Sequence, residues 1–457
     1  MLFIIYFIFL CFIACYELFR NKKSFIDFMT IFNMFFIFDY LIPVLIFNYD
    51  ITMYHEWRFL EILPEAGSSF LVMLMIVLSY ISLIVGYTYS MYNNKYQYEM
   101  SFKYGEKSQF YIMVAFFLIF MISFLMYSQA QGGIAYMIMH AKDIRAGRLS
   151  AGGVQYLVYL ADMLVISMII FLSFWKLGIK PRIRKVSKYL FFISFIFSLL
   201  YALSTGGRAN IGMVFLLILF FMLNIYSQKI NLKKLFIFGA FGIFIFILVK
   251  YGKSVIWSLP ALEGGVLAFL SAVENHYAWY VAESSNILES SIGFARNKDH
   301  AIASIYAILQ NNELYEVPRL FFDWIRGVID ILPGVGWVDL YVSDTPSAIN
   351  RDFFGKDGYV PPGFVAMKLM NGGVLWLVVG SFIAGIVGAF LSKAIYRSWN
   401  NSPLFPAYFI LIAFFWKDNI VGPDPFMVFL PNIVFIVVAI LYLSIVIFKK
   451  TGVNAEA

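Results

Sequence analysis

Long apolar runs separated by short polar segments dominate the chain. Eleven of these runs are long enough for a helix to cross a bilayer, which takes about 20 residues. They cover residues 2–19, 24–48, 69–91, 109–129, 156–175, 189–204, 209–227, 235–250, 371–392, 403–421 and 426–448. This pattern predicts an all-α polytopic membrane protein with about 11 transmembrane helices.

The loops between these runs alternate in charge. Nineteen of the 34 Lys and Arg residues fall in every second loop. They are Arg20, Lys22, Lys23, Lys95, Lys103, Lys107, Lys176, Lys180, Arg182, Arg184, Lys185, Lys188, Lys229, Lys233, Lys234, Lys393, Arg397, Lys449 and Lys450. Because basic loops stay on the cytoplasmic side, we expect the N-terminus outside and the C-terminus in the cytoplasm.

One segment, residues 251–370, is too long to be a simple connection. Its stretches Val266–Ala282 and Val317–Leu332 have helical spacing but are too short and too charged to span, which predicts re-entrant or interfacial helices. We expect one integrated domain: spans 1–8 in residues 1–250, an extracytoplasmic helical cap in 251–370, and spans 9–11 with a cytoplasmic tail in 371–457.

The composition agrees with a membrane protein. The chain is 61% hydrophobic and 13% charged, with a net charge of +7, which excludes a water-soluble or disordered protein. The only cysteines, Cys11 and Cys15, lie inside the first run, so neither a disulfide framework nor a Cys-based zinc site is expected. The basic residues follow membrane sidedness, which favours contact with membrane lipids and argues against a nucleic-acid partner.

Candidate chemistry concentrates on the outer face. The cytoplasmic loops hold no Gly-rich phosphate loop, so we expect no nucleotide cofactor. All four histidines map outside: His55, His140, His276 and His300. So do eight arginines: Arg58, Arg145, Arg148, Arg208, Arg296, Arg319, Arg326 and Arg351. Guanidinium groups bind phosphate oxygens in a bidentate fork, so arginines gathered at membrane depth suit a lipid-linked diphosphate.

Arg208 stands at a turn that favours anion binding. It follows Thr205-Gly206-Gly207 in LSTGGRANIG, between two predicted spans. The glycines allow close backbone approach, and the positive end of the next helix begins there. The alternative is an interfacial arginine that reaches lipid headgroups.

Three further segments carry the other arginines. Arg145 and Arg148, in HAKDIRAGRLSAGG, lie three residues apart and so on one side of a helical turn, where they would clamp a diphosphate or form a solvated loop. Arg319 and Arg326, in VPRLFFDWIRG, stand among aromatic residues that suit sugar rings or an interfacial belt. Arg351 lies in the Gly- and Pro-rich segment SDTPSAINRDFFGKDGYVPPGF.

A glycosyl transfer also needs a base for the acceptor hydroxyl. His276, His300, Asp344 and Asp323 lie on the outer side and are the candidates, with structural hydrogen bonding as the alternative for each. The spacing of His and acidic residues predicts no metal site.

Three acidic residues fall inside predicted spans: Asp27, Asp39 and Asp162. Intramembrane carboxylates mark ion paths in transporters. We expect no basic partner for them within the spans and no paired broken helices, which favours hydrogen bonding between packed helices.

The chain resembles the Wzy-type oligosaccharide repeat-unit polymerases of O-antigen and capsule. The resemblance rests on the layout of spans around a long outer loop, on LSTGGRANIG opening a span, and on the order VPRLFFDWIRG followed by PPGFVAMKLMNGGVLWLVVG. The layout covers nearly the whole chain and the motifs about a tenth of it.

The resemblance implies a GT-C-like fold in the bacterial cytoplasmic membrane and two undecaprenyl-diphosphate-linked oligosaccharides as donor and acceptor. The growing chain would move from its lipid diphosphate to a new repeat unit, with Arg208, Arg319 and Arg351 neutralising the leaving diphosphate. It also implies a chain-length regulator as partner. The alternatives are an O-antigen-ligase-like transferase and a flippase or transporter of lipid-linked oligosaccharides.

Overall fold

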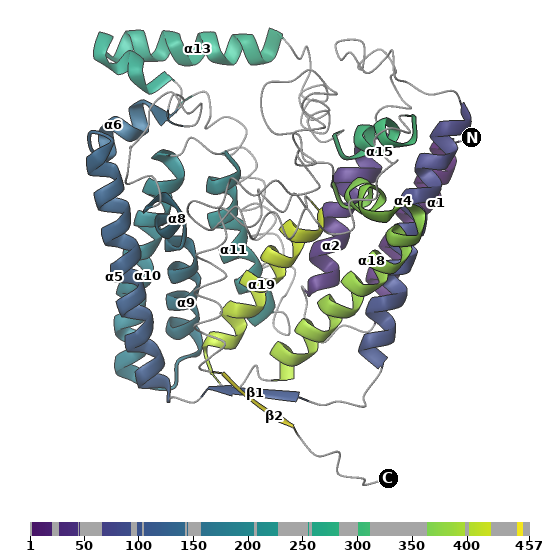
Figure 1. Cartoon of the computed structure of the whole chain (residues 1–457). Helices are drawn as coiled ribbons and strands as arrows, with labels where there is room; N and C mark the ends of the chain where they lie inside the picture. The colour runs from purple at the N-terminus through teal and green to yellow at the C-terminus, as the bar shows by residue number, and fades with distance from the viewer. Residues whose placement is uncertain are drawn as a thin grey trace, which may run out of the picture.

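The structure is a computed structural model of the chain. It describes residues 2–20, 27–43, 45, 66–92, 98–102, 105–141, 144, 157–204, 208–226, 255, 258–282, 300–310, 363–397, 402–421 and 446–450. These residues are almost entirely helical, as Figure 1 shows, so the prediction of an all-α membrane protein holds at this coarse level.

The long helices follow the apolar runs. They are α1 (Leu2–Phe19), α2 (Phe28–Phe36) continued by the π-helix η1 (Ile37–Leu41), α4 (Ala66–Tyr92), α5 (Glu106–Ala130), α8 (Leu157–Asp162), α9 (Leu164–Leu177), α10 (Pro181–Ser204), α11 (Arg208–Tyr226), α18 (Gly363–Arg397) and α19 (Leu404–Val421). Among the described residues, five stretches are long and apolar enough to cross a membrane: Phe70–Tyr92, Glu106–Ala130, Leu160–Leu177, Pro181–Ser204 and Gly363–Lys393.

Two groups of helices make up the bundle, and α19 connects them. One group contains α1, α2, α4 and α18, and the other contains α5, α8, α9 and α10 (Figure 1). Helix α19 packs against α2 and α18 on one side and α9 and α11 on the other. Its Phe409 ring meets Phe28 of α2 edge-on, and its preceding Pro403 carbonyl accepts a hydrogen bond from Ser173 of α9.

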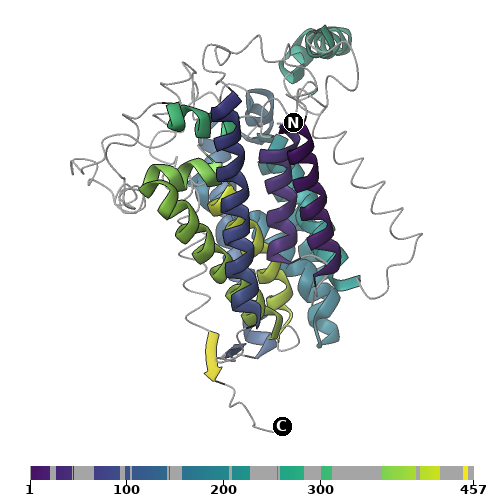
Figure 2. The ribbon, with the colours of Figure 1, turned by 90° about the vertical axis from the view of Figure 1, so that its right-hand side faces the viewer.

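Three smaller helices lie at one end of the bundle: α6 (Ile134–Met139), α13 (Val266–Ala282) and α15 (His300–Gln310). The 3-10 helix η6 (Leu259–Gly264) connects α6 to α13 by direct packing. Helix α13 lies across the bundle direction in Figures 1 and 2. Its bounds confirm the helix predicted at Val266–Ala282, whereas Val317–Leu332 lies outside the described residues.

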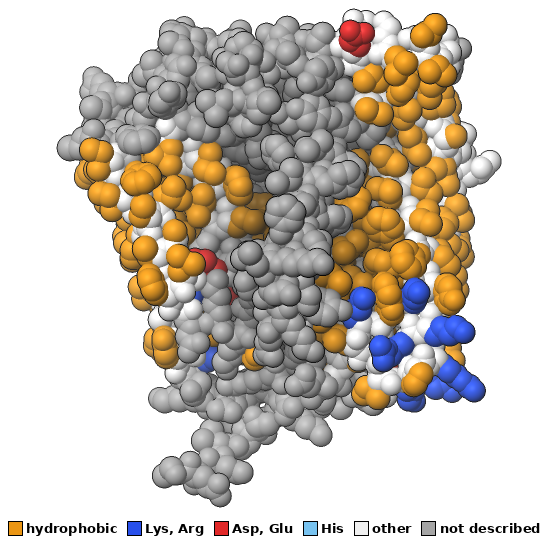
Figure 3. Space-filling view, turned by 180° about the vertical axis from the view of Figure 1, so that it is seen from behind, with side chains coloured by type: hydrophobic (Ala, Val, Ile, Leu, Met, Phe, Trp, Pro, Cys, Tyr) orange, Lys and Arg blue, Asp and Glu red, His pale blue; other side chains and the backbone are white. Residues whose placement is uncertain are grey.

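The opposite end carries basic residues. In Figure 3, Lys and Arg side chains gather below a broad apolar band. Lys180, Arg182, Arg184, Lys185 and Lys188 are exposed there, around the turn between α9 and α10. Which end faces the cytoplasm stays a prediction of the charge pattern.

Two predicted span boundaries are wrong. Helix α10 begins at Pro181 rather than 189, because proline fits the first turn of a helix and the basic residues after it project into water. Helix α18 begins at Gly363 rather than 371, so the proposed cap boundary at residue 370 falls within a helix. Predicted span 235–250 lies outside the described residues.

The end of the last predicted span is also wrong. Residues 446–450 form strand β2 (Val446–Lys450), which pairs antiparallel with β1 (Tyr98–Phe102). The register places Glu99 opposite Lys449, an opposite-charge pair of the kind that stabilises cross-strand pairing. The β-branched Val446 and Ile447 favour an extended chain where a partner strand is present.

Candidate functional site

Three of the predicted site residues fall in described helices, all at the α6–α13–α15 end. Arg208 is the first residue of α11, His276 lies in α13 and His300 is the first residue of α15. The structure describes the backbone of these three residues. The other predicted residues lie outside the described part: Arg145, Arg148, Arg319, Arg326, Asp323, Asp344 and Arg351.

A small apolar cluster brings two arginine-bearing segments together. Ala141, Ala202 and Ile211 are buried against one another, and Leu259 of η6 packs on them. Ala141 stands four residues before Arg145, and Ile211 stands three residues after Arg208. Ala141, at the described end of the first segment, therefore lies close to the first turn of α11. Sequence reasoning singled out both segments but gave no reason for them to be neighbours.

The two candidate histidine helices are held by different neighbours. Helix α13 packs on η6, whereas α15 packs on α18, α4 and η1 through the buried residues Ile302, Ile305 and Ile308. A third histidine, His140, packs against Tyr136, with ring centroids 4.1 Å apart and ring planes tilted by 35°. The backbone thus places His276 near the α6 side and His300 near the α18 side of this end of the bundle.

Helix α18 is interrupted close to the α15 side. Gly372 (φ 177°, ψ 33°) and Gly373 (φ 62°, ψ −155°) leave the helical conformation, and only glycine adopts the second of these readily. The segment before the break is anchored by the Val365 N–H, which donates to the Tyr40 hydroxyl of η1 at 3.1 Å. Helix interruptions and π-helices both concentrate at functional sites.

Lys368 is a charged side chain that sequence reasoning missed. It lies four residues before the break, and its Nζ is 3.1 Å from the centroid of the Phe364 ring. The signal was present in the sequence, as a single lysine in the apolar run FVAMKLMNGG that leads into the predicted span 371–392. The predicted phosphate-binding residues were all arginines, so Lys368 was not among them.

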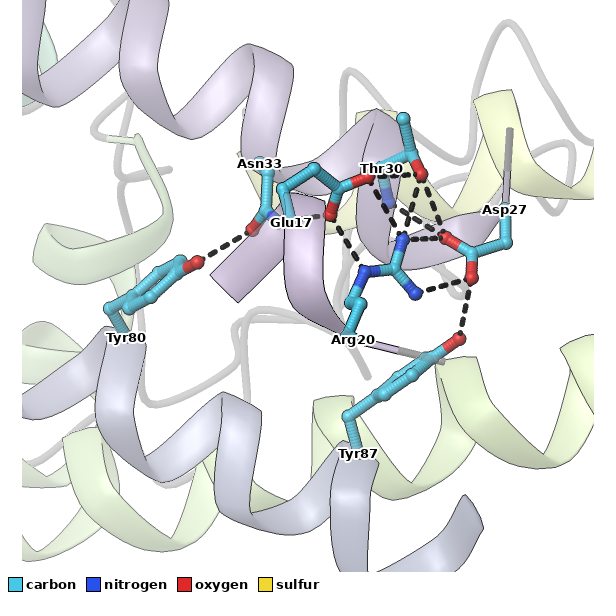
Figure 4. Close-up of polar contacts among 7 residues, drawn as sticks. All are labelled: Glu17, Arg20, Asp27, Thr30, Asn33, Tyr80 and Tyr87. Atoms are coloured by element: carbon cyan, nitrogen blue, oxygen red, sulfur yellow. Dashed lines mark hydrogen bonds and ion pairs between the residues drawn. The ribbon is translucent and has the colours of Figure 1, made fainter. Parts of the chain in front are cut away.

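The most extensive polar network joins α1, α2 and α4 near the basic end (Figure 4). Arg20 donates to both oxygens of Asp27 at 2.5 Å and to both oxygens of Glu17 at 2.7 and 3.0 Å. The side chains of Arg20 and Asp27 are only 9% and 6% exposed. Asp27 therefore has a basic partner, which comes from just outside the predicted span 2–19.

Four uncharged side chains complete this network. The Thr30 hydroxyl donates to Glu17 and accepts from Arg20, and Asn33 donates to Glu17 at 2.8 Å. The Tyr80 hydroxyl donates to Asn33 at 2.8 Å, and the Tyr87 hydroxyl donates to Asp27 at 3.3 Å. Asp27 is also the N-cap of α2, since its carboxylate accepts from the Thr30 N–H at 2.9 Å.

The electrostatics of this network indicate a structural role for it and not a catalytic one. Burial disfavours the charged guanidinium, but hydrogen bonds and ion pairs with Asp27 and Glu17 outweigh burial and raise the pKa of Arg20 above its ordinary value. All three guanidinium nitrogens of Arg20 donate hydrogen bonds to other side chains of this network (Figure 4). The network therefore holds the end of α1 and the start of α2 against α4.

Comparison with protein-family models, with characterised proteins and with solved structures finds no match. Within the described residues, no three His, Cys, Asp or Glu side chains come together in a way that would hold a metal ion.

Proposed function

We propose that the protein is a glycosyltransferase that polymerises polyprenyl-diphosphate-linked oligosaccharide units at the outer face of a bacterial cytoplasmic membrane. The observation that supports the proposal best is the buried cluster of Ala141, Ala202 and Ile211. Helix α11 begins at Arg208, three residues before Ile211, and Arg145 follows Ala141 by four residues in the sequence. Arginines that meet at one end of an apolar bundle would suit a lipid-linked diphosphate.

In the proposed reaction, a hydroxyl of the acceptor sugar attacks the anomeric carbon of the donor. The bond from that carbon to the diphosphate oxygen breaks, and undecaprenyl diphosphate leaves with the bonding electrons. Arg208, with Arg319 and Arg351 as further candidates, stabilises the charge that develops on the diphosphate. His276, His300 or Asp344 accepts the hydroxyl proton. Cleavage of the glycosyl–phosphate bond of the donor supplies the free energy, so no nucleotide is required.

A ligase-like transferase would share this donor and this leaving group. The two enzymes differ in the acceptor, which for a ligase is not a second lipid-linked repeat unit. Supplying purified protein with lipid-linked repeat units as the sole acceptor separates them, because only a polymerase then yields products of two or more repeats.

One observation favours a lipid-linked oligosaccharide flippase as the second candidate. The broken helix α18 and the π-helix η1 meet at the Val365–Tyr40 hydrogen bond, and discontinuous helices are common at transporter binding sites. Extension of lipid-linked repeats in detergent, where no compartments exist, is expected of a polymerase and not of a flippase.

The decisive experiment is chain extension by purified protein in detergent. We expect a ladder of products from the wild type and from Arg182→Ala, which alters an exposed arginine at the basic end. We expect Arg208→Ala to lower the rate roughly a hundredfold or more, as removal of a group that stabilises transition-state charge does. If Arg208→Ala produces wild-type ladders at equal protein level, Arg208 is not part of the diphosphate site.

A further inference from the structure

Lys368 stands alone as a charge in a long apolar helix. Between Gly363 and Ser392, α18 contains no other Asp, Glu, Lys or Arg residue. The residues around Lys368 in the segment before the break are buried: Phe364, Val365, Ala366, Met367, Leu369, Met370 and Asn371. An ionisable side chain within a membrane-spanning segment is costly and usually serves a partner or a ligand.

No protein carboxylate neutralises Lys368 within the part of the chain that the structure describes. The ion pairs there are those of Arg20 with Glu17 and Asp27, in the network near the basic end. The contact of Lys368 is with the face of the Phe364 ring. A cation over an aromatic face is attracted to the ring, but the ring carries no counter-charge.

Gly380 leaves space for the Lys368 side chain on the far side of the break. A Cβ at Gly380 would lie 3.4 Å from Lys368 Cε and 3.0 Å from Trp376 Nε1. Lys368 therefore reaches from the first segment of α18 to the second. The bend in α18 that allows this is visible in Figures 1 and 2.

The break also adds positive potential and apolar surface. The second segment of α18 begins after Gly373, and the first N–H groups of a helix have no acceptor four residues earlier. Val374 and Leu375, directly after the break, are 45% and 76% exposed. A cation, a helix start and exposed apolar side chains are thus adjacent along the chain.

We propose that Lys368 binds the phosphoryl oxygens of a polyprenyl diphosphate whose chain lies along the apolar surface beside the α18 break. The inference rests on the proposed function and assigns that function a phosphate-binding residue outside the predicted arginines. A lysine ammonium binds phosphate as a point charge with three donors. An apolar tail distinguishes this ligand from free diphosphate, and two phosphoryl groups distinguish it from a phospholipid headgroup.

The test measures binding to the purified full-length protein in neutral detergent. The probes are farnesyl diphosphate, inorganic diphosphate and phosphatidylglycerol, with farnesol as the uncharged analogue of the first. Binding is followed by the shift in unfolding temperature and by tryptophan fluorescence. For the wild type we expect saturable binding of farnesyl diphosphate, at least tenfold tighter than that of the other three probes.

Three variants locate the site. Lys368→Met removes the charge and keeps the length of the side chain, and we expect it to weaken farnesyl diphosphate binding roughly ten- to a hundredfold. Lys368→Arg keeps the charge and is expected to stay within about fivefold of the wild type. Lys185→Met removes an exposed lysine at the basic end and is expected to bind like the wild type.

Two results would overturn the inference. One is unchanged farnesyl diphosphate affinity in Lys368→Met. The other is equally tight binding of phosphatidylglycerol or inorganic diphosphate by the wild type. Failure of the proposed function gives a different result. If the wild type has no polymerase activity but still binds farnesyl diphosphate through Lys368, the polymerase proposal is rejected and the Lys368 site is retained. If the wild type extends chains and Lys368→Met binds farnesyl diphosphate normally, the Lys368 site is rejected and the polymerase proposal is retained.

Discussion

At the scale of single residues, the main lesson concerns the buried ion pair of Arg20. Arg20 and Asp27 stand on either side of a basic turn, where the sequence pattern places a solvated loop. Tyr87, which donates to Asp27, comes from α4 and lies 60 residues later in the chain. No local periodicity encodes a contact over that separation, so the network could not be predicted from the sequence. Lys368, in contrast, could have been predicted from the sequence, because its isolation in an apolar run is a local feature.

We predict that Arg20→Met destabilises the protein strongly, because it leaves the buried carboxylate of Asp27 and the partly buried carboxylate of Glu17 without a counter-charge. Breaking a buried pair from one side costs about 3–5 kcal/mol. The measurement is the unfolding temperature of the detergent-purified protein, with Arg182→Met, at an exposed position, as the matched control.

The double variant Arg20→Met with Asp27→Asn tests the reason for that loss. Asparagine keeps the N-cap of α2 while it removes the charge. We expect the double variant to be more stable than the sum of the single effects by about 1–3 kcal/mol. Strictly additive losses would show that the two groups do not interact.

At the scale of elements, the sequence predicts helices well and their interruptions poorly. Apolar length alone gives α1, α4, α5, α11 and α19 to within a few residues, because a bilayer demands that length of helix. The interruptions at Met163 and Gly372–Gly373 and the π-helix η1 depend on what each segment packs against. Strand β2 depends on β1, which lies more than 300 residues earlier.

The pairing of α4 with α18 depends on two glycines. A Cβ at Gly86 would overlap the carbonyl oxygen of Phe382, and one at Gly385 would overlap the carbonyl oxygen of Leu83. Such close backbone approach by small residues is a common way for membrane helices to associate.

We predict that Gly86→Ala and Gly385→Ala each destabilise the protein by about 1–3 kcal/mol, since the added methyl group has no space and forces the helices apart. The measurement is the unfolding temperature in detergent. The controls are Val85→Ala and Val387→Ala, exposed positions next to or near these glycines on the same helices. Glycine variants as stable as these controls would mean that α4 and α18 are not in close contact.

At the scale of the whole molecule, the distribution of charge predicts how the bundle is oriented in the membrane. The exposed lysines and arginines around the α9–α10 turn lie at one end, and α13, which carries Glu274, lies at the other (Figure 3). The proposed chemistry requires the α13 end to face outward, because Arg208, His276 and His300 all belong to helices at that end.

Labelling of single cysteines tests this orientation directly. The native cysteines, Cys11 and Cys15, are free and would first be changed to serine. Glu274→Cys then probes the α13 end and Lys185→Cys the basic end, both at exposed positions. With a membrane-impermeant maleimide on intact spheroplasts, we expect Glu274→Cys to react and Lys185→Cys to react only after permeabilisation, because basic loops remain in the cytoplasm. The reverse pattern would place the arginine-bearing helix starts on the cytoplasmic side, where a transfer between extracytoplasmic lipid-linked sugars has no substrate, and the polymerase proposal would then fail together with the orientation.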